Sequence, residues 1–275
     1  MTDPSSTAKA RPVRLLQLTD PHLFADPATE IYGVRTAESF HRTLQQALAE
    51  GAPPDAILVT GDIGDDLSEA AYRRFREVLE AAGVPVYCLA GNHDDPARMA
   101  PLLAGGRFQF GGRARLGAWG LALVDSHVPG EPHGLVSPAA FARLEGDLHV
   151  LRDLPVLLAV HHPPVPVGSP WIDAVGLRNA AELLTRLERF PNVQVIVSGH
   201  VHQAFDARRG TLRLLTTPST CAQFTPRTLD CAMDTRPPGY RWLHLAPGGR
   251  FDTEVKWLEG WAPQGPVVDS RAGGD

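Results

Sequence analysis

The stretch Val84-Pro-Val-Tyr-Cys-Leu-Ala-Gly-Asn-His-Asp94 decides the fold, because an apolar run in it ends abruptly in four polar residues. The apolar part, Val84–Ala90, is typical of a strand that is buried in a sheet. The polar part, Gly91–Asp94, begins where that strand ends. Asn and His at a single strand exit are ordinary loop residues. The tetrapeptide becomes informative only if other strands end in the same way.

Four other apolar runs end similarly. They lead into Asp20-Pro-His22, Gly61-Asp62, His161-His162 and Gly199-His200-Val-His202. In open α/β sheets, ligands bind beyond the carboxyl ends of the strands. Five strands that deliver Asp, Asn or His at that edge therefore predict a metal site, and the number of donors favours two metals.

Helical patterns separate the first strands. Amphipathic helices are predicted after Thr36 and after Ser68, and Gly51 and Gly83 end them. The resulting order, β-α-β-α-β, predicts a parallel α/β unit. A further helix is expected over 177–190, before the strand that delivers His200.

In the last third of the sequence, strand patterns are no longer separated by helical patterns. Short strands are predicted at 211–217, 240–245 and 253–258, and Gly/Pro turns join them. Because no helical pattern lies between these strands, we interpret them as the second sheet of a two-sheet core.

The composition is that of a globular protein, since 43% of the 275 residues are hydrophobic and 21% are charged. Residues 1–12 and 261–275 are predicted to be loose tails around one domain at 13–260. The net charge of −5 and the lack of a Lys/Arg run argue against nucleic acid as a partner. No apolar stretch approaches the ~18 residues of a membrane span, and the N-terminus lacks a signal-peptide core. We therefore expect a cytoplasmic protein.

The strand exits contain seven candidate metal ligands: Asp20, His22, Asp62, Asn92, His161, His200 and His202. The i, i+2 pairs are expected in extended chain, where both side chains point the same way. One metal is assigned to Asp20, His22, Asp62 and His202, and the other to Asp62, Asn92, His161 and His200. Asp62 has two carboxylate oxygens and is therefore the expected bridge. Mixed nitrogen and oxygen donors favour Mn, Fe, Co or Zn over Ca or Mg.

The adjacent residues His161 and His162 are expected to face opposite ways, so that one binds metal and the other makes a supporting hydrogen bond. A metal pair about 3.5–4 Å apart clamps an in-line displacement at phosphorus, with a bridging hydroxide as the nucleophile. His93 follows Asn92 directly and is the candidate catalytic residue that protonates the departing oxygen. Asp94 either orients His93 or caps the helix that begins at Pro96.

The ordered set of exits resembles the calcineurin-like metallophosphoesterases over residues 13–220, through Asp20-x-His22, Gly61-Asp62, Gly91-Asn92-His93-Asp94, His161 and Gly199-His200-x-His202. The resemblance implies a four-layer α/β/β/α sandwich with a dinuclear metal site at the carboxyl-terminal strand edges. It also implies that His161, and not His162, binds metal.

The segments 161–173, 177–179 and 217–224, together with Pro132-His133-Gly134, resemble the bacterial class III 3′,5′-cyclic-AMP phosphodiesterases. That resemblance implies hydrolysis of cyclic AMP to 5′-AMP with Fe or Mn bound, and Zn or Co as alternatives. A glycerophosphodiester or broad-specificity phosphodiesterase is the alternative function. A non-catalytic scaffold is a remote one, because such proteins are expected to lose ligands or the residue at His93. The sequence is compatible with a homodimer.

The Pro/Gly-rich segment 163–176 leaves the metal edge and is expected to form a pocket wall. Trp171 either stacks on a base or packs against the helix after Leu177. Asn179 and the loop 219–223 either contact the substrate or serve as a helix cap and a turn. The candidate substrate contacts are His22, Asn92, His93, His133, Trp171 and His202.

Overall fold

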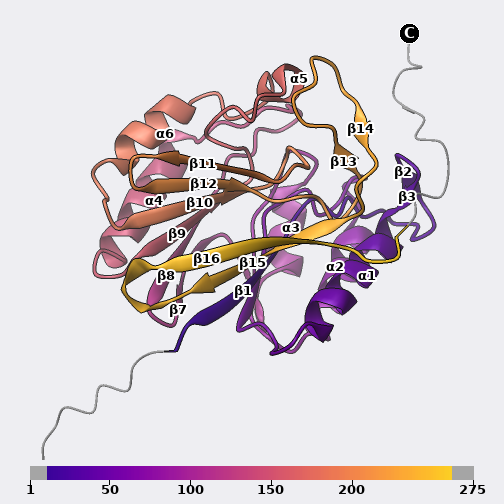
Figure 1. The fold of residues 1–275 in the computed structure, drawn as a ribbon, viewed down its shortest axis with the longest axis horizontal. Helices are drawn as coiled ribbons and strands as arrows, with labels where there is room; N and C mark the ends of the chain where they lie inside the picture. Colours follow the sequence, from indigo (N-terminus) through magenta and orange to yellow (C-terminus); the bar gives the residue numbers. More distant parts are fainter. Residues whose placement is uncertain (1–10, 262–275) are drawn as a thin grey trace, which may run out of the picture.

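Two six-stranded sheets packed face to face form the centre of the computed structural model, which describes residues 11–261 (Figure 1). The first sheet has the order β16-β15-β1-β4-β5-β6, and the second has the order β11-β12-β10-β9-β8-β7. The strands of the first sheet are β1 (Val13–Leu18), β4 (Ala56–Val59), β5 (Val86–Cys88), β6 (Phe108–Phe110), β15 (Gly239–Leu245) and β16 (Phe251–Trp257). Those of the second are β7 (Gly112–Leu116), β8 (Trp119–Val124), β9 (Val156–Val160), β10 (Val193–Ser198), β11 (Phe205–Arg209) and β12 (Leu212–Thr216).

The central strands of each sheet are parallel. β1, β4, β5 and β6 pair in parallel in the first sheet, and β8, β9, β10 and β12 do so in the second. Antiparallel strands complete the edges: β15 and β16 beside β1, β7 beside β8, and β11 beside β12. Parallel strands deliver their carboxyl ends to one edge of a sheet, so this topology gathers the polar strand exits.

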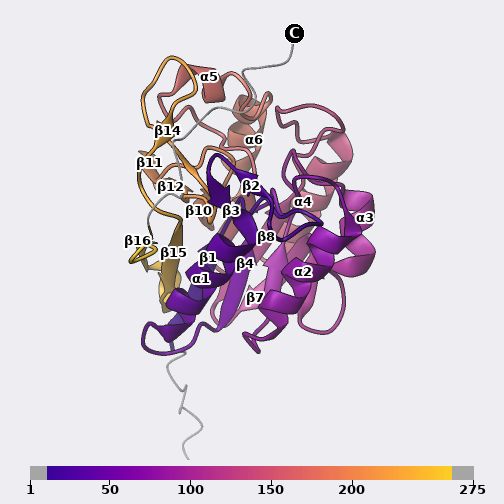
Figure 2. The ribbon, with the colours of Figure 1, turned by 90° about the vertical axis from the view of Figure 1, so that its right-hand side faces the viewer.

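Helices cover the outer face of each sheet. The helices are α1 (Thr36–Ala49), α2 (Glu69–Glu80) and α3 (Pro96–Leu102) on the first sheet, and α4 (Pro138–Val150) and α6 (Ala180–Leu187) on the second. Figure 2 shows α1 and α2 in front of β1 and β4. A third apolar cluster fills the space between the sheets, with Leu15, Leu58 and Val197 among its members. The predicted four-layer α/β/β/α sandwich is therefore confirmed.

Serine side chains cap two of the helices. Ser68 precedes α2, and its Oγ accepts a hydrogen bond from Ala71 N at 3.1 Å. Ser137 does the same for α4 through Ala140 N at 3.1 Å, and Pro138 occupies the first helical position. Such caps satisfy backbone N–H groups that the helix leaves unpaired, and each contributes about 1 kcal/mol.

The prediction for the last third of the chain was wrong in its pairing. Its strands do not form a sheet of their own, because β11 and β12 extend the second sheet, whereas β15 and β16 extend the first. β15 pairs antiparallel with β1, so that Leu245 lies opposite Val13. A hairpin with one apolar face can complete the edge of either sheet, and its own pattern does not specify which one.

Several local bounds also differ. The helix predicted over 177–190 is shorter, because Leu177 bridges to Gly134 and the Asn179 side chain binds the backbone of Val136. The segment 163–176 contains a short helix, α5 (Pro170–Asp173). There are also two small hairpins: β2 (Glu30–Ile31) with β3 (Val34–Arg35), and β13 (Gln223–Phe224) with β14 (Met233–Asp234).

The predicted tails fall almost entirely on residues 1–10 and 262–275, which lie outside the described residues. Within 11–261, no helix combines the length and apolarity that a membrane crossing requires.

Candidate metal centre

The candidate ligands follow strands of both sheets. In the first sheet, β1 leads to Asp20 and His22, β4 to Asp62 and β5 to Asn92; in the second, β9 leads to His161 and β10 to His200 and His202. Apart from the half-buried Asn92, all of these residues are buried. The structure therefore brings the whole predicted set to the space between the two carboxyl-terminal strand edges.

One group of donors surrounds the facing imidazoles of His22 and His202. Their Nε2 atoms are 3.1 Å apart. The Oδ1 atom of Asp20 lies 3.7 Å from His202 Nε2, and Oδ2 of Asp62 lies 3.8 Å from His22 Nε2. These four residues are the set predicted to hold the first metal.

A second group surrounds the side-chain oxygen of Asn92. That Oδ1 atom lies 3.1 Å from His161 Nε2 and 2.9 Å from His200 Nδ1. Asp62 Oδ2 lies 3.4 Å from the same His161 nitrogen. Asp62 thus contacts both groups, as a bridging carboxylate must.

The hydrogen bonds behind the imidazoles fix which nitrogen carries the proton. His161 Nδ1 lies 2.7 Å from the carbonyl oxygen of Thr60, and His202 Nδ1 lies 2.8 Å from that of Ala222. A carbonyl only accepts, so both Nδ1 atoms donate, and in the neutral form of each imidazole the Nε2 lone pair points inward. His22 Nδ1 is held by the Asp65 carboxylate at 3.0 Å in the same way. Lone pairs that converge beside carboxylates repel one another unless a cation lies between them, so the donor set fits divalent metal ions.

The backbone at these residues is in the left-handed region. Eight non-glycine residues of the described range have positive φ, and five of them are Asp20 (51°), His22 (48°), Asp62 (50°), His200 (68°) and His202 (48°). The prediction of extended chain at the i, i+2 pairs was therefore wrong, because each strand has already ended. Such conformations cost of order 1 kcal/mol or more, and they concentrate where a site demands a particular side-chain direction.

The ionisable groups of the centre are buried close together, and this shifts their pKa values. Burial raises the pKa of Asp20 to about 6, because the carboxylate has lost its water. Burial also opposes ionisation of Asp62, but the imidazoles of His161, His93 and His22 outweigh it and hold that pKa well below its usual range. Burial and the neighbouring His161 lower the pKa of His200 to about 3, so its imidazole is neutral and able to bind a metal.

His93 occupies the rim of the centre with 28% of its side chain exposed. Its Nδ1 lies 2.9 Å from Oδ1 of Asp65, and its backbone N–H donates to Asp62 Oδ1 at 2.9 Å. Hydrogen bonds from His22 and His93 overcome the effect of burial and depress the pKa of Asp65. The sequence analysis missed Asp65; the available signal was a second carboxylate three residues after Asp62.

Asp94 has neither of the two roles predicted for it. Its carboxylate accepts hydrogen bonds from the backbone N–H groups of Ile63, Gly64 and Gly91, and so ties the exit of β5 to that of β4. The next residue, Asp95, caps α3 by accepting from Ala97 N at 3.0 Å.

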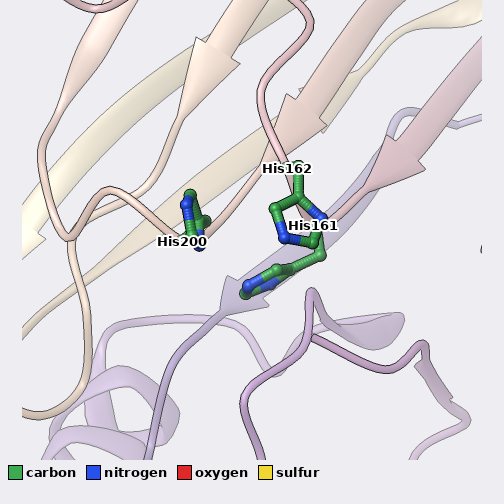
Figure 3. Close-up of side chains that lie close together, drawn as sticks. All are labelled: His161, His162 and His200. Carbon is green, nitrogen blue, oxygen red and sulfur yellow. The ribbon is translucent and has the colours of Figure 1, made fainter. Parts of the chain in front are cut away.

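His161 and His162 do not face opposite ways, contrary to the prediction. Figure 3 shows both rings close to His200; the ring of His162 lies 4.8 Å from that of His161 and 4.6 Å from that of His200. Alternation fails here because β9 ends at Val160. The two nitrogens of His162 lie near Ser126 Oγ (2.8 Å) and Pro132 O (3.3 Å), and burial lowers its pKa well below the usual value. His162 therefore packs behind the centre, whereas His161 contacts Asp62 and Asn92.

A cavity of about 180 Å³ opens beside the donors. Its polar lining residues are His22, Asp62, Asn92, His93, His200 and His202. The other lining residues are largely apolar or aromatic: Ile31, Tyr32, Pro132, Trp171, Ile172, Val175 and Phe224. The sequence analysis did not single out Ile31 or Tyr32, which reach the cavity from the hairpin of β2 and β3.

Trp171 lines this cavity, as expected of the segment 163–176. Its ring meets that of Phe224 edge-on at 5.0 Å, so it packs on Phe224 rather than on the helix after Leu177. His133 is absent from the lining residues of the described chain, and its Nδ1 lies 3.3 Å from Glu131 Oε2.

Two other candidate contacts have structural roles. Asn179 binds both backbone groups of Val136, at 3.0 and 2.9 Å. In the loop 219–223, Ser219 Oγ donates to Asp20 O at 2.7 Å, and Gln223 closes the loop on Ser219. Ser219 therefore braces the exit of β1, whereas Asn179 ties α6 to the segment before α4.

Comparison with known proteins identifies related sequences. The family model of the calcineurin-like phosphoesterases matches residues 13–204. The chain is 40% identical over 247 residues to the 3′,5′-cyclic adenosine monophosphate phosphodiesterase CpdA of Escherichia coli K12, and 37% identical over 247 residues to that of Pseudomonas aeruginosa. Each alignment covers 90% of both proteins. A 3′,5′-cyclic-nucleotide phosphodiesterase of Nostoc is 33% identical over 94% of this chain and 97% of its own length.

Solved structures share the fold at low sequence identity. A dimetal phosphatase from Danio rerio superposes with a TM-score of 0.59 at 14% identity, covering 90% of this chain and 99% of its own. GAP50, the anchor in the inner membrane complex of Plasmodium, gives 0.64 at 13% identity and covers 91% and 86%. One neighbour is a phosphatase and the other an anchor, so these likenesses show the fold alone.

Proposed function

The chain belongs to the calcineurin-like phosphoesterase family, and we propose that it hydrolyses 3′,5′-cyclic AMP to 5′-AMP. The observation that carries the proposal is the convergence of imidazole lone pairs and carboxylates beside an open cavity. Similarity to relatives named as cyclic-AMP phosphodiesterases, over nine tenths of both chains, supports this substrate.

The family and the His/Asp groups support divalent-metal binding. We propose Fe or Mn as the ions, held by Asp20, His22, Asp62 and His202 on one side and by Asp62, Asn92, His161 and His200 on the other. When bound, such a pair supplies Lewis-acid stabilisation of the phosphoryl oxygens and activates water for in-line attack.

The protein's own residues then transfer a proton to the departing oxygen. Asp65 holds Nδ1 of His93 at 2.9 Å, so Nε2 is the nitrogen that acts on the substrate, and the carboxylate charge stabilises the protonated imidazole. As the attacking oxygen bonds to phosphorus and the P–O3′ bond breaks, O3′ takes the proton from His93 Nε2. The neutral imidazole that remains can accept the proton lost by the attacking water, which restores the starting state.

The cavity is suited to a small phosphodiester. Within residues 11–261, no Lys or Arg lines it, so it provides no cationic side chains for a polyphosphate or a nucleic-acid backbone. A cyclic nucleotide carries one negative charge, which the metal ions neutralise. The aromatic lining residues Trp171, Phe224 and Tyr32 offer apolar surface to the base. Residence in the cytoplasm, a homodimer and a single domain at 13–260 stay predictions of the sequence.

A substrate panel tests this proposal. The purified protein, loaded with Mn²⁺ or Fe²⁺, is expected to convert cyclic AMP to 5′-AMP, identified by chromatography against 3′-AMP. Cyclic GMP, glycerophosphocholine and bis(p-nitrophenyl) phosphate complete the panel, and an Asp62→Asn variant is the inactive control. Turnover of the aryl diester without turnover of cyclic AMP would contradict the assigned substrate. Faster turnover of glycerophosphocholine would favour a glycerophosphodiesterase.

A further inference from the structure

The core between the two sheets becomes polar close to the carboxyl-terminal strand edges, where the candidate metal ligands lie. On β1, the inward-facing side chains Val13 and Leu15 are apolar, and the next one on that face is Gln17. The same change from apolar to polar occurs along three other strands. Leu58 of β4 is followed on its face by Thr60, and Leu215 of β12 by Thr217. On β15, which runs antiparallel to β1, Leu243 is preceded by Arg241. All four polar residues are at least 97% buried, since none exposes more than 3% of its surface.

Gln17 connects the two sheets within this polar layer. Its Nε2 donates to Thr60 Oγ1 of the first sheet at 3.1 Å and to Ser198 O of the second at 3.4 Å. Its Oε1 accepts from Thr217 Oγ1, beyond β12, at 2.7 Å. Both ends of the amide are thus engaged, and the buried polar group carries no unmet hydrogen-bonding cost.

Arg241 extends the layer from β15. Its Nε donates to Thr217 Oγ1 at 3.0 Å, and its Nη2 donates to the carbonyl oxygen of Thr216 at 2.8 Å. Because β15 belongs to the first sheet and β12 to the second, these bonds also cross between the sheets. Thr217 is therefore held by Gln17 on one side and by Arg241 on the other.

This layer lies directly beneath the candidate ligands. Gln17 precedes Asp20 by three residues, and Ser198 precedes His200 by two. Thr60 precedes Asp62 by two, and its carbonyl oxygen holds His161 at 2.7 Å. The sheets approach closely here, since a Cβ added to Gly199 would lie 2.1 Å from Thr19 Oγ1.

Each proposed metal takes ligands from both sheets, so the separation of the sheets at this edge sets the shape of each metal site. Apolar contacts are non-directional and allow a layer to shift, whereas hydrogen bonds fix both distance and register. We propose that Gln17 is a positioning residue that sets this separation and thereby the geometry of the metal pair. The inference rests on the dinuclear centre proposed above.

Two variants break the link without leaving a large void. Gln17→Met keeps the approximate volume and removes the hydrogen bonds, and Thr217→Val removes the shared hydroxyl. Thr217→Ser retains that hydroxyl and is the conservative match. Leu245→Ala, in the same inter-sheet core at its far end, is the control for general loss of packing.

The readout is Mn²⁺ binding to the full chain, measured as affinity and stoichiometry by calorimetry and as the exchange-coupled signal of a manganese pair by low-temperature EPR. In Gln17→Met and Thr217→Val, we expect the affinity for the metal pair to fall about 10- to 100-fold and the coupled signal to change. Thr217→Ser should behave like the wild type. Leu245→Ala should lower Tm and keep the wild-type signal.

Wild-type affinity and an unchanged coupled signal in Gln17→Met and Thr217→Val would overturn the inference. So would equal losses in Thr217→Ser and Thr217→Val, because the hydroxyl would then be irrelevant. Should Gln17→Met fail to fold, the Thr217 pair decides the question. A wild-type protein that binds no metal pair would overturn the proposed centre itself, and that outcome is seen before any variant is compared.

Discussion

Asp65 and His93 are half-buried residues in direct contact, with the carboxylate Oδ1 2.9 Å from the imidazole Nδ1. The same oxygen lies 3.0 Å from Nδ1 of His22, a candidate metal ligand. One carboxylate therefore orients both the proposed proton donor and a candidate metal ligand. Because Asp65 makes both contacts, its substitution should affect both catalysis and metal binding. Substitution of His93 should affect catalysis alone.

The variant Asp65→Asn should reduce both kcat and metal affinity. The amide preserves the shape but loses the charged hydrogen-bond acceptor that orients His93 and His22, so we expect a loss of about 10- to 100-fold in metal affinity. Steady-state kinetics at saturating Mn²⁺, together with a metal titration, measure the two effects. Asp66→Asn is the matched control, because Asp66 binds the backbone of Ala25 and Ser68 instead. Unchanged metal affinity in Asp65→Asn would contradict the role at His22.

The variant His93→Ala should lose rate and keep its metals. General-acid catalysis contributes about 10²- to 10⁴-fold, and this loss should appear in kcat. The backbone N–H of residue 93 still donates to Asp62 after the substitution, so the centre keeps that contact. Metal analysis of the purified variant checks the second expectation. His133→Ala, outside the cavity, should retain full activity; a rate for His93→Ala within a factor of two of wild type would exclude His93 as the acid.

Trp171→Ala should weaken binding of cyclic nucleotides more than binding of simple diesters. Trp171 lines the cavity and packs edge-on against Phe224, so its removal takes away aromatic surface offered to a base. Base–aromatic contacts contribute roughly 1–3 kcal/mol, which corresponds to an increase in KM of about 5- to 150-fold. Bis(p-nitrophenyl) phosphate, which has no base, is the comparison substrate. Equal increases in KM for both substrates would indicate that Trp171 only supports the cavity wall.

The strand exits could be predicted from the sequence because burial and strand ends are local properties. Val156–Val160 is apolar throughout, and His161 follows it directly, so both the strand and the exit are visible in the order of residues. The parallel order of the strands then brings such exits to one edge. For this reason Asp20, Asp62 and Asn92 could be placed near His161 before any coordinates were known.

Other features depend on contacts that no local pattern contains. The pairing of β15 with β1 joins residues more than two hundred positions apart, and an apolar hairpin fits either sheet. Asp65 reaches His93 only because the loops after β4 and β5 lie side by side. The direction of the His162 ring was predicted wrongly because strand alternation was applied beyond the end of β9.

Removal of the metals should lower the thermal stability of the protein. The lone pairs of His22 and His202 face each other at 3.1 Å beside buried carboxylates, and a cation between them is the main favourable partner. A ligand present at 100 times its Kd stabilises the folded state by about 2.7 kcal/mol. For a chain of this size, that corresponds to roughly 5–10 °C in Tm. Scanning calorimetry with and without a chelator measures the shift, and Asp62→Asn, which loses the shared ligand, should show a much smaller one. Equal Tm values for the chelated and Mn²⁺-loaded wild type would contradict a cation site at this edge.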